Sequence, residues 1–208
     1  MQQETKPHLT LVLPGGLLET GRLAAVDRVA QRYGLTAYLT TLQNLRLLGV
    51  TAENIGPIRE ELRAAGLTVK APGMFPVPKV CVGRPYCKLA LRDIAGLAES
   101  VRIAFGDRTA VKPKIKIAMA ACPASCSGAF LADIGVVATR SGYDLHAGGK
   151  GGGARPKTGR LLLRGVDPEQ VVEAIGALVA FHNQRTVTKQ RLYKLLDDPA
   201  FPYPPLSA

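Results

Sequence analysis

The four cysteines of this 208-residue chain constrain its fold more than any other feature, because all four fall between residues 81 and 126. Cys81 and Cys87 enclose five residues, and Cys122 and Cys126 enclose three. A chain of this length with 47% hydrophobic residues can bury a core without disulfide bonds, and a reducing compartment keeps its thiols reduced. The clustering therefore predicts a metal or cluster site around which this part of the chain folds.

The spacing of the cysteines separates the kinds of site that they can form. Structural zinc sites usually place about two to four residues inside each cysteine pair, so the five-residue loop VGRPY is unusual for zinc. An iron-sulfur cluster is larger than a single ion and is held by thiolates that a wider loop can surround. The spacing favours an iron-sulfur cluster, with a structural zinc site and reduced core cysteines as the alternatives.

The chain is strongly basic, since 27 Lys and Arg oppose 16 Asp and Glu and give a net charge of +11. This surplus predicts an anionic partner, and nucleic acid, a phosphate-bearing ligand and a polycarboxylate all fit it. Stacking on single-stranded nucleic acid is disfavoured, because the chain has no Trp and only 5% aromatic residues. The apolar run over residues 174–181 is too short to cross a bilayer and the N-terminus lacks a secretory pattern, so we expect no membrane and a cytoplasmic location.

Hydrophobic periodicity in the first third of the chain indicates alternating strands and helices. Gly34 suits the left-handed position after a helix, and Thr51 suits the N-cap of the next one. We expect strands at residues 8–13, 36–41 and 67–71, and helices at residues 21–34 and from Thr51. This order predicts an α+β fold whose first lobe, residues 1–75, is a ferredoxin-like α/β sandwich.

Three prolines, at positions 72, 76 and 78, mark a boundary near residue 76. We expect a mixed α/β lobe over residues 76–198, followed by an extended tail over residues 199–208. Within this lobe we expect strands at residues 112–120, 134–139 and 142–147, and helices at residues 89–106, from Pro168 behind an Asp167 N-cap, and at residues 187–198.

Two basic segments of the second lobe are candidates for anion binding. If residues 112–120 form a strand, the two-residue period puts Lys112, Lys114 and Lys116 on one face, although such a row is often only a solvated surface. Residues 148–153, GGKGGG, form a flexible glycine loop that leads into the basic residues Arg155 and Lys157.

The segments CVGRPYC and PKIKIAMAACPASCSGAFLADIGVV resemble the signature of the siroheme-dependent sulfite and nitrite reductase family. LPGG, GRL, the "LT..QN" run at residues 39–44 and GGKGGGARP extend the resemblance over nearly the whole chain. The resemblance implies a ferredoxin-like lobe followed by a lobe that binds siroheme and a [4Fe-4S] cluster.

The resemblance also assigns roles to individual residues. It implies that Cys81, Cys87, Cys122 and Cys126 hold the [4Fe-4S] cluster and that Cys126 also bridges to the siroheme iron. Siroheme carries carboxylates that need fixed cations and backbone donors. We therefore expect the glycine loop to bind it, through Gly149, Gly151, Lys150, Arg155 and Lys157.

Lys114 and Lys116 fall where the family places two lysines that hold the anionic substrate, and they are the expected catalytic residues. Two departures weaken the match: Leu42 stands where the family has an arginine, and the strand around Thr10 lacks another. Arg46 is one substitute that the sequence offers. Lys79 and Arg84, beside the first cysteine pair, are others.

The sequence thus predicts an oxidoreductase that carries out the six-electron reduction of sulfite to sulfide, or of nitrite to ammonia. It would take electrons from a donor such as ferredoxin, and a docking patch of Arg185, Lys189, Arg191 and Lys194 is one possibility for it, against a merely solvated helix face. The larger family enzymes contain two copies of this module, so we expect a homodimer. We expect no nucleic acid partner for such a reductase. The alternatives are an electron-transfer or accessory subunit without sulfite turnover, and a basic zinc protein that binds nucleic acid.

Overall fold

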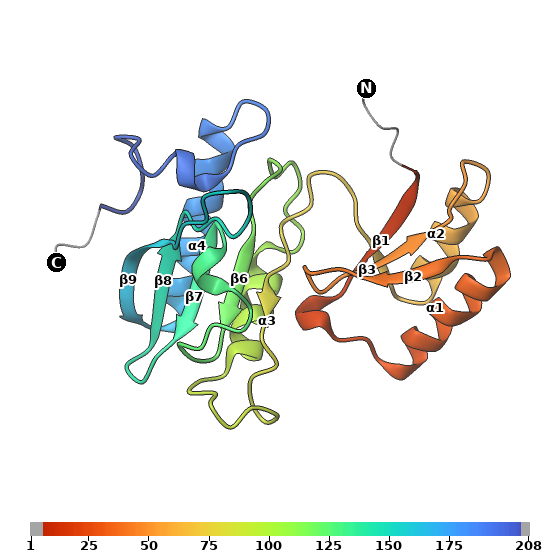
Figure 1. Cartoon of the computed structure of the whole chain (residues 1–208), viewed down its shortest axis with the longest axis horizontal. Helices are drawn as coiled ribbons and strands as arrows, with labels where there is room; N and C mark the ends of the chain where they lie inside the picture. Colours follow the sequence, from red (N-terminus) through yellow and green to blue (C-terminus); the bar gives the residue numbers. More distant parts are fainter. Residues whose placement is uncertain (1–5, 205–208) are drawn as a thin grey trace. The chain divides into compact units, whose positions relative to one another are not determined.

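The computed structural model describes residues 6–204, and the expected tail over residues 199–208 is therefore described only in part. The chain divides into two units that meet between Pro72 and Gly73. Each unit has its own sheet and its own hydrophobic core, shown in red to orange and in yellow to blue in Figure 1.

The first unit has the element order βαββαβ. Its strands and helices are β1 (His8–Val12), α1 (Thr20–Tyr33), β2 (Thr36–Leu39), β3 (Leu45–Leu48), α2 (Ile55–Ala64) and β4 (Thr68–Val69), with a short 3-10 turn η1 (Pro14–Gly16) after β1. The four strands form one sheet in the order β2-β3-β1-β4, and all of its pairs are antiparallel. This arrangement is the predicted ferredoxin-like sandwich.

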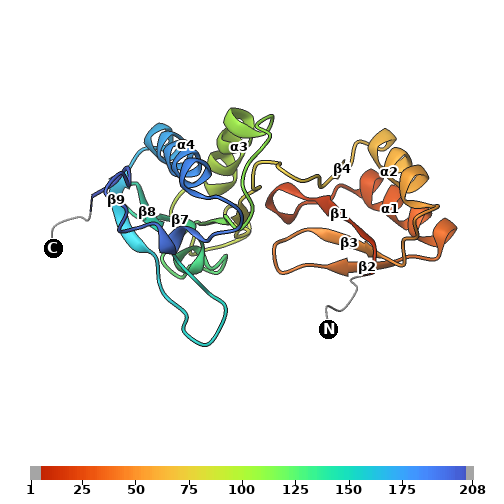
Figure 2. The ribbon, with the colours of Figure 1, turned by 90° about the horizontal axis from the view of Figure 1, so that it is seen from above.

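One face of this sheet is apolar and the other is polar. Leu9, Leu11, Leu45 and Leu47 are buried beneath α1 and α2, which lie on the same side of the sheet in Figure 2. Residues of the opposite face come into register across three strands, since Arg46 pairs with Thr10 of β1 and with Tyr38 of β2. The alternation along β3 therefore leaves an uncovered polar face.

Two details of the first unit differ from the prediction. Strand β3 was missed, because LRLL is too short to separate a strand from a helix by periodicity alone. Thr51 is not the N-cap of α2, which begins four residues later at Ile55. Thr51 and Asn54 instead exchange hydrogen bonds, in which each side-chain oxygen accepts from the other backbone N–H, at 2.7 and 3.3 Å.

The second unit contains a five-stranded sheet in the order β5-β6-β7-β8-β9. Its elements are β5 (Lys79–Val80), α3 (Ile94–Phe105), β6 (Ile117–Ala120), η2 (Ala129–Leu131), β7 (Ile134–Ala138), β8 (Tyr143–Ala147), β9 (Arg160–Val166), α4 (Pro168–Arg185) and η3 (Leu192–Lys194). Strands β5, β6 and β7 are parallel, whereas β7, β8 and β9 are antiparallel. The lobe is mixed α/β, as predicted.

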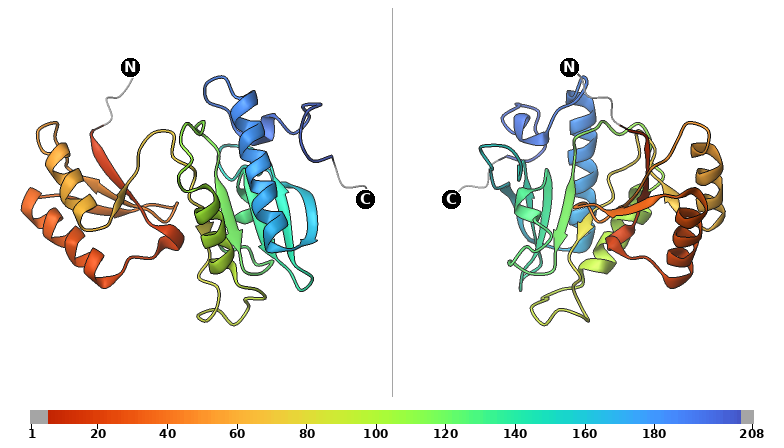
Figure 3. Two further views of the ribbon diagram at one scale, coloured as in Figure 1. Left: turned by 180° about the vertical axis from the view of Figure 1, so that it is seen from behind. Right: turned by 45° about the vertical axis from the view of Figure 1, so that its right-hand side comes forward.

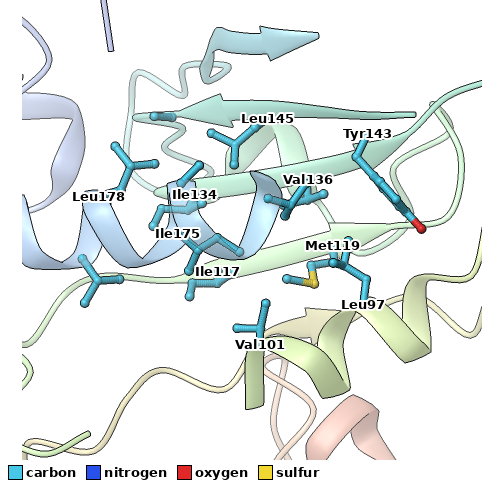
Figure 4. Packing of buried hydrophobic residues seen from close by; sticks show 14 of the residues in the cluster. Leu97, Val101, Ile117, Met119, Ile134, Val136, Tyr143, Leu145, Ile175 and Leu178 are labelled. Carbon is cyan, nitrogen blue, oxygen red and sulfur yellow. The ribbon is translucent and has the colours of Figure 1, made fainter. Parts of the chain in front are cut away.

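The core of the second unit lies between the sheet and two helices. Helices α3 and α4 run side by side across one face of the sheet (Figure 3, left). Ile134, Val136 and Leu145 project from the sheet toward Leu97 of α3 and Ile175 of α4, as Figure 4 shows. Because α3 and α4 cover this face, the cysteine and glycine loops are built at the strand ends and on the other face.

Local signals explain where the elements of the second unit begin. Asp167 and Pro168 start α4 as predicted, and Asp167 Oδ1 accepts a hydrogen bond from Gln170 N at 2.8 Å. Helix α3 begins at Ile94 rather than at residue 89, because Asp93 caps it by accepting from Gly96 N at 3.0 Å.

Three segments of the second unit differ from the prediction. The strand expected at residues 112–120 forms only from Ile117 onward, and the helix expected at residues 187–198 is reduced to η3. Strand β9 was not anticipated. Within residues 6–204, no helix is both long enough and apolar enough to span a membrane.

Candidate cofactor site

The two cysteine loops begin at the carboxyl ends of neighbouring parallel strands. Val80 of β5 pairs with Met119 of β6, and Cys81 follows directly, with its backbone N–H bonded to Met119 O at 3.2 Å. Cys122 follows the last residue of β6, Ala120, after one intervening residue. Parallel strands end at the same edge of a sheet, which is where α/β folds place ligands. The parallel pair therefore brings both cysteine loops to one edge.

Hydrogen bonds join these two loops to each other. Ala121 N donates to Cys81 Sγ at 3.1 Å, and Leu91 N, beyond the first loop, donates to Ala121 O at 2.8 Å. Inside the first loop, Cys87 N donates to the carbonyl of Gly83 at 2.8 Å. The backbone N–H that reaches Cys81 Sγ is the kind of donor that stabilises a thiolate.

The four cysteines are free thiols and differ in their exposure. Cys81, Cys87 and Cys122 are half-buried, and Cys126 is the exposed one. Cys81 and Cys87 also pack against the core of the second unit. The cysteine that is expected to bridge to a second group is thus the one that an outside group can reach.

The described residues do not build a site for a single metal ion. Among residues 6–204, no three His, Cys, Asp or Glu side chains gather closely enough to hold one. A tetrahedral zinc, with Zn–S bonds of about 2.3 Å, would need its sulfurs within about 4 Å of each other. An iron-sulfur cube separates its thiolates more widely than a single ion does.

Ser127 supplies a second indication that a further group belongs here. It follows Cys126, is only 4% exposed, and its hydroxyl has no hydrogen-bond partner among residues 6–204. An unpaired buried hydroxyl costs about 1–3 kcal/mol, and the sulfur atoms of a cluster are acceptors that would satisfy it. The residues present therefore fit the cluster that the cysteine spacing predicts.

The glycine loop forms a hairpin rather than an irregular loop. Lys150 and Lys157 face each other and exchange backbone hydrogen bonds at 2.8 and 2.9 Å. Residues 151–158, which include Arg155, are exposed. The hairpin projects from the sheet on the side opposite α3 and α4, as the cyan loop in Figure 2 shows. It thus presents Arg155 and Lys157 to solvent, whereas Lys150 at its base is half-buried.

The base of this hairpin packs against the end of the cysteine loop. A Cβ added to Gly149 would lie 2.4 Å from Ala132 O and 2.5 Å from Phe130 O. A Cβ on Gly151 would lie 3.2 Å from the Leu131 side chain. These residues belong to or follow η2, so glycine permits the close approach. The structure thereby brings together the cysteine and glycine loops that the sequence selected.

The expected lysine row does not exist as a strand face. Lys114 lies in a turn with a φ of 76°, and Lys116 precedes β6 with its backbone N–H bonded to Asp133 Oδ2 at 2.9 Å. Lys112 Nζ instead donates to Val187 O at 3.5 Å. Lys114 and Lys116 are both exposed and accessible to an anion. They lie in a turn and just before β6, however, and not on one face of a strand.

Sequence reasoning missed a buried ion pair beside these loops. Asp133 is fully buried, and Arg191 Nε donates to its Oδ1 at 2.7 Å. Burial raises the pKa of Asp133, while Arg191 and two backbone N–H groups oppose that rise. Arg191 was considered only for a docking patch. The available signals were the place of Asp133 in the ADIG segment that resembles the family signature, and its acidic side chain inside the otherwise apolar run at residues 129–138.

The first unit contains a cationic cavity on its uncovered sheet face. Its volume is about 460 Å³. It is lined by His8, Thr10, Tyr38, Thr40, Thr41, Leu42, Asn44, Arg46 and Lys70, none of which is acidic. Among the described residues, no group forms a hydrogen bond with the buried Nε of Arg46. Arg46 thus lines the same cavity as Leu42 and Thr10, the positions where arginines were expected.

The other two substitutes lie in the second unit. Arg84 Nε donates to Ala90 O at 3.1 Å, so part of its guanidinium is engaged within the first cysteine loop. Lys79 of β5 places Nζ 3.7 Å from the position of a Cβ on Gly128, beside the second cysteine loop. Lys79 is therefore a cation of the cysteine site itself.

Comparison with known proteins gives the same interpretation. Residues 77–199 match the family described as "Nitrite and sulphite reductase 4Fe-4S domain", and residues 1–65 match "Nitrite/Sulfite reductase ferredoxin-like half domain". An NAD(P)H nitrite reductase of Emericella nidulans is 30% identical over 89% of this chain, which covers 17% of that protein. An assimilatory-type sulfite reductase of Nitratidesulfovibrio vulgaris is 28% identical over 88% of this chain and 84% of its own length.

Solved structures support the fold. The Mycobacterium tuberculosis NirA protein matches 91% of this chain with a TM-score of 0.71 and 20% identity, over 37% of its own length. Dissimilatory sulfite reductase I matches 91% with a TM-score of 0.78 and 14% identity, over 66% of its length. This chain spans less than a fifth of the first nitrite reductases that it matches, at 17% and 19%.

The predicted fold class and the predicted cofactors, a [4Fe-4S] cluster and siroheme, are confirmed by the family match. The interpretation as a zinc protein that binds nucleic acid is wrong. By its sequence profiles and by its two cysteine loops, the chain belongs to the nitrite and sulphite reductase family.

Proposed function

We propose that this chain reduces sulfite to sulfide in a six-electron reaction at a siroheme coupled to a [4Fe-4S] cluster. The observation that carries the proposal is the meeting of the cysteine loop and the basic glycine hairpin at η2. One loop offers thiolates and the other offers cations within the same unit. This is the donor set that an iron-sulfur cube beside a carboxylate-bearing tetrapyrrole requires.

Each loop has a separate task in this proposal. The four cysteines would hold the cluster, and the exposed Cys126 is the one that would also serve the siroheme. Lys150, Arg155 and Lys157 neutralise siroheme carboxylates, while Gly149 and Gly151 let the hairpin approach η2 closely. When bound, the two cofactors would pass electrons from the external donor to the substrate.

Lys114 and Lys116 are the proposed substrate residues. Both ammoniums are exposed, and Lys116 is fixed at its backbone by Asp133. Reduction of sulfite releases its oxygens as water and therefore consumes protons, which closely placed ammoniums can relay while they bind the anion. Exposure of both groups leaves them accessible to an anion.

The cationic cavity of the first unit supports an anionic ligand in that unit as well. Arg46 and Lys70 are cations of its lining, and we assign to them the place of the arginines that are absent at Leu42 and Thr10. A guanidinium can bind two oxygens of a carboxylate or oxyanion at once, whereas leucine binds none. We therefore assign to Arg46 the anion-binding role that Leu42 cannot fill.

Sulfite is the preferred substrate because the relative that this chain covers almost completely, at 84% of its length, is an assimilatory-type sulfite reductase. Nitrite is the second candidate, from the nitrite reductases at 30% and 31% identity. An accessory subunit without turnover is the third, and Leu42 inside the cationic cavity is the observation that favours it.

The proposal extends to partners. Lys189 and Lys194 are exposed cations beyond α4 that suit an acidic donor such as ferredoxin, whereas Arg191 is committed to Asp133. We also propose a homodimer in a reducing, cytoplasmic environment that keeps the four thiols free for the cluster.

Turnover with an artificial donor tests the function. Anaerobically purified protein with siroheme bound should oxidise dithionite-reduced methyl viologen when sulfite is added, and release sulfide. Nitrite in place of sulfite separates the two substrates. Full cofactor occupancy without sulfite-dependent or nitrite-dependent oxidation would assign the chain to the accessory class, and a protein that binds no siroheme would overturn the proposal altogether.

A further inference from the structure

We propose that Asp133 and Arg191 are a positioning pair that fixes both the glycine hairpin and Lys116, and that the segment after α4 thereby becomes part of the cofactor site. The inference rests on the proposed function, since it assigns a task to residues around the same site. Neither residue has to touch substrate or cofactor for this task. They act through the loops that do.

The carboxylate of Asp133 is the centre of the arrangement. It is 0% exposed and accepts three hydrogen bonds. Oδ1 accepts from Arg191 Nε at 2.7 Å and from Leu192 N at 3.1 Å, and Oδ2 accepts from Lys116 N at 2.9 Å. One side chain therefore joins the entrance of β6, the start of β7 and the segment around η3.

The same two residues also reach the base of the hairpin. Gly148 N donates to the backbone carbonyl of Asp133 at 2.8 Å, and Arg191 Nη2 donates to Gly149 O at 3.1 Å. Gly149 is the residue that lies against η2. The Asp133–Arg191 pair thus fixes the hairpin at the point where it meets the end of the cysteine loop.

The segment beyond α4 adds two further contacts with the hairpin. Lys150 Nζ lies 5.6 Å from the centre of the Tyr193 ring, within range of a cation–π interaction. Leu196 lies so close to Gly148 that an added Cβ would be within 2.4 Å of its Cδ1. The segment around η3 therefore follows the hairpin over three successive residues.

Charge and geometry suggest positioning rather than stabilisation as the reason for the pair. A buried ion pair contributes little net stability compared with well-packed apolar residues, because both charges lose their hydration. Its directional hydrogen bonds instead fix orientation, and the planar guanidinium of Arg191 bonds Asp133 and Gly149 through two different nitrogens. A lysine has one nitrogen and cannot reproduce that fork.

Hydrogen exchange on the protein without siroheme tests the structural step. The readout is the exchange of the Lys150 and Lys157 amides, which are paired across the hairpin. Arg191→Gln and Arg191→Lys should both speed their exchange, while Arg185→Gln should not. The control breaks another ion pair, the more exposed one between Arg185 of α4 and Asp198 at 3.3 Å. Unchanged exchange in Arg191→Gln, or full restoration by Arg191→Lys, would overturn the positioning role.

Siroheme binding tests the consequence. In Arg191→Gln, affinity for added siroheme should fall by about tenfold or more, as is usual when an outer-shell partner of a metal site is lost. It should remain within about twofold in Arg185→Gln. Equal affinity for siroheme in both variants would refute the inference. So would a loss of affinity in Arg191→Gln that is fully explained by a lower stability of the whole protein against urea.

Two arrangements keep the outcomes distinct. Arg191→Gln removes the guanidinium that is paired with the buried Asp133 carboxylate. The double variant Asp133→Asn/Arg191→Gln therefore serves where the single variant does not fold, since Asn retains an acceptor oxygen for Lys116 N or Leu192 N. A wild-type protein that binds no siroheme, but whose hairpin loosens in Arg191→Gln, would refute the proposed function and leave the positioning pair intact. Normal siroheme binding by the wild type and all variants would refute the inference alone.

Discussion

Replacing Gly149 by alanine tests the junction between the hairpin and the cysteine loop. The new Cβ would lie 2.4 Å from Ala132 O, 2.5 Å from Phe130 O and 2.7 Å from Leu131 C. All three are backbone atoms, so the overlap is not relieved by rotating a side chain. The hairpin base or the turn at η2 has to move.

The size of the effect follows from overpacking. Inserting a methyl group into a closely packed site lowers the free energy of unfolding by about 1–3 kcal/mol. Because the Cβ would meet backbone atoms, we expect a loss of about 2 kcal/mol here. At about 2–4 °C per kcal/mol for a chain of this length, Tm should fall by about 4–8 °C. The displaced hairpin should also bind siroheme more weakly than in the wild type.

Gly152→Ala is the matched control, because it lies in the same hairpin and an added Cβ meets nothing within 4 Å. Thermal unfolding followed by circular dichroism gives Tm, and titration with siroheme gives the affinity. Gly152→Ala should match the wild type in both. If Gly149→Ala also matched it, the close packing between hairpin and η2 would not be what orders this site.

Further substitutions test other parts of the proposal. If the Lys116 ammonium relays protons, Lys116→Met should lower viologen-driven sulfite turnover by about 100-fold or more. Lys112→Met is the control and should leave turnover unchanged, because the Lys112 ammonium donates to Val187 O instead. Similar rates in both variants would contradict the assignment. Leu42→Arg should add a cation to the cavity of the first unit and raise the affinity of the protein for an added oxyanion, measured by titration with sulfite, and an unchanged affinity would mean that this cavity does not hold anions. Burial lowers the pKa of His146, so folding favours its neutral form, and stability should be lost as pH falls below the ordinary histidine pKa of about 6.5. His146→Phe should flatten urea-unfolding stability between pH 7 and pH 5, and an unaltered slope would show that His146 is not the group responsible.

The parts of the site that the sequence predicted are those encoded locally. The two cysteine pairs indicate a cluster site, and the run of glycines indicates a flexible loop, each from only a few neighbouring residues. The start of α4 was predicted for the same reason, because Asp167 and Pro168 form the N-cap and first turn themselves.

The parts that the sequence did not predict depend on contacts between distant residues. Asp133 and Arg191 are 58 positions apart, and nothing near either residue indicates the other. The prediction of a lysine row was wrong because the alternation of Lys and Ile over residues 112–117 resembles a strand. In the structure, β6 pairs with β7 only from Ile117 onward. Strand β3 was lost because four residues carry too little periodicity, although its pairing with β1 and β2 is clear in the sheet.

The central claim is that four thiolates hold one iron-sulfur cube and that the exposed one is shared with siroheme. Anomalous diffraction at the iron edge, from crystals of the anaerobically prepared protein, measures this directly. We predict four irons bonded to Cys81, Cys87, Cys122 and Cys126, and a fifth iron, in a tetrapyrrole, next to Cys126 Sγ. A single metal ion among the four sulfurs, or a tetrapyrrole iron remote from Cys126, would contradict the account.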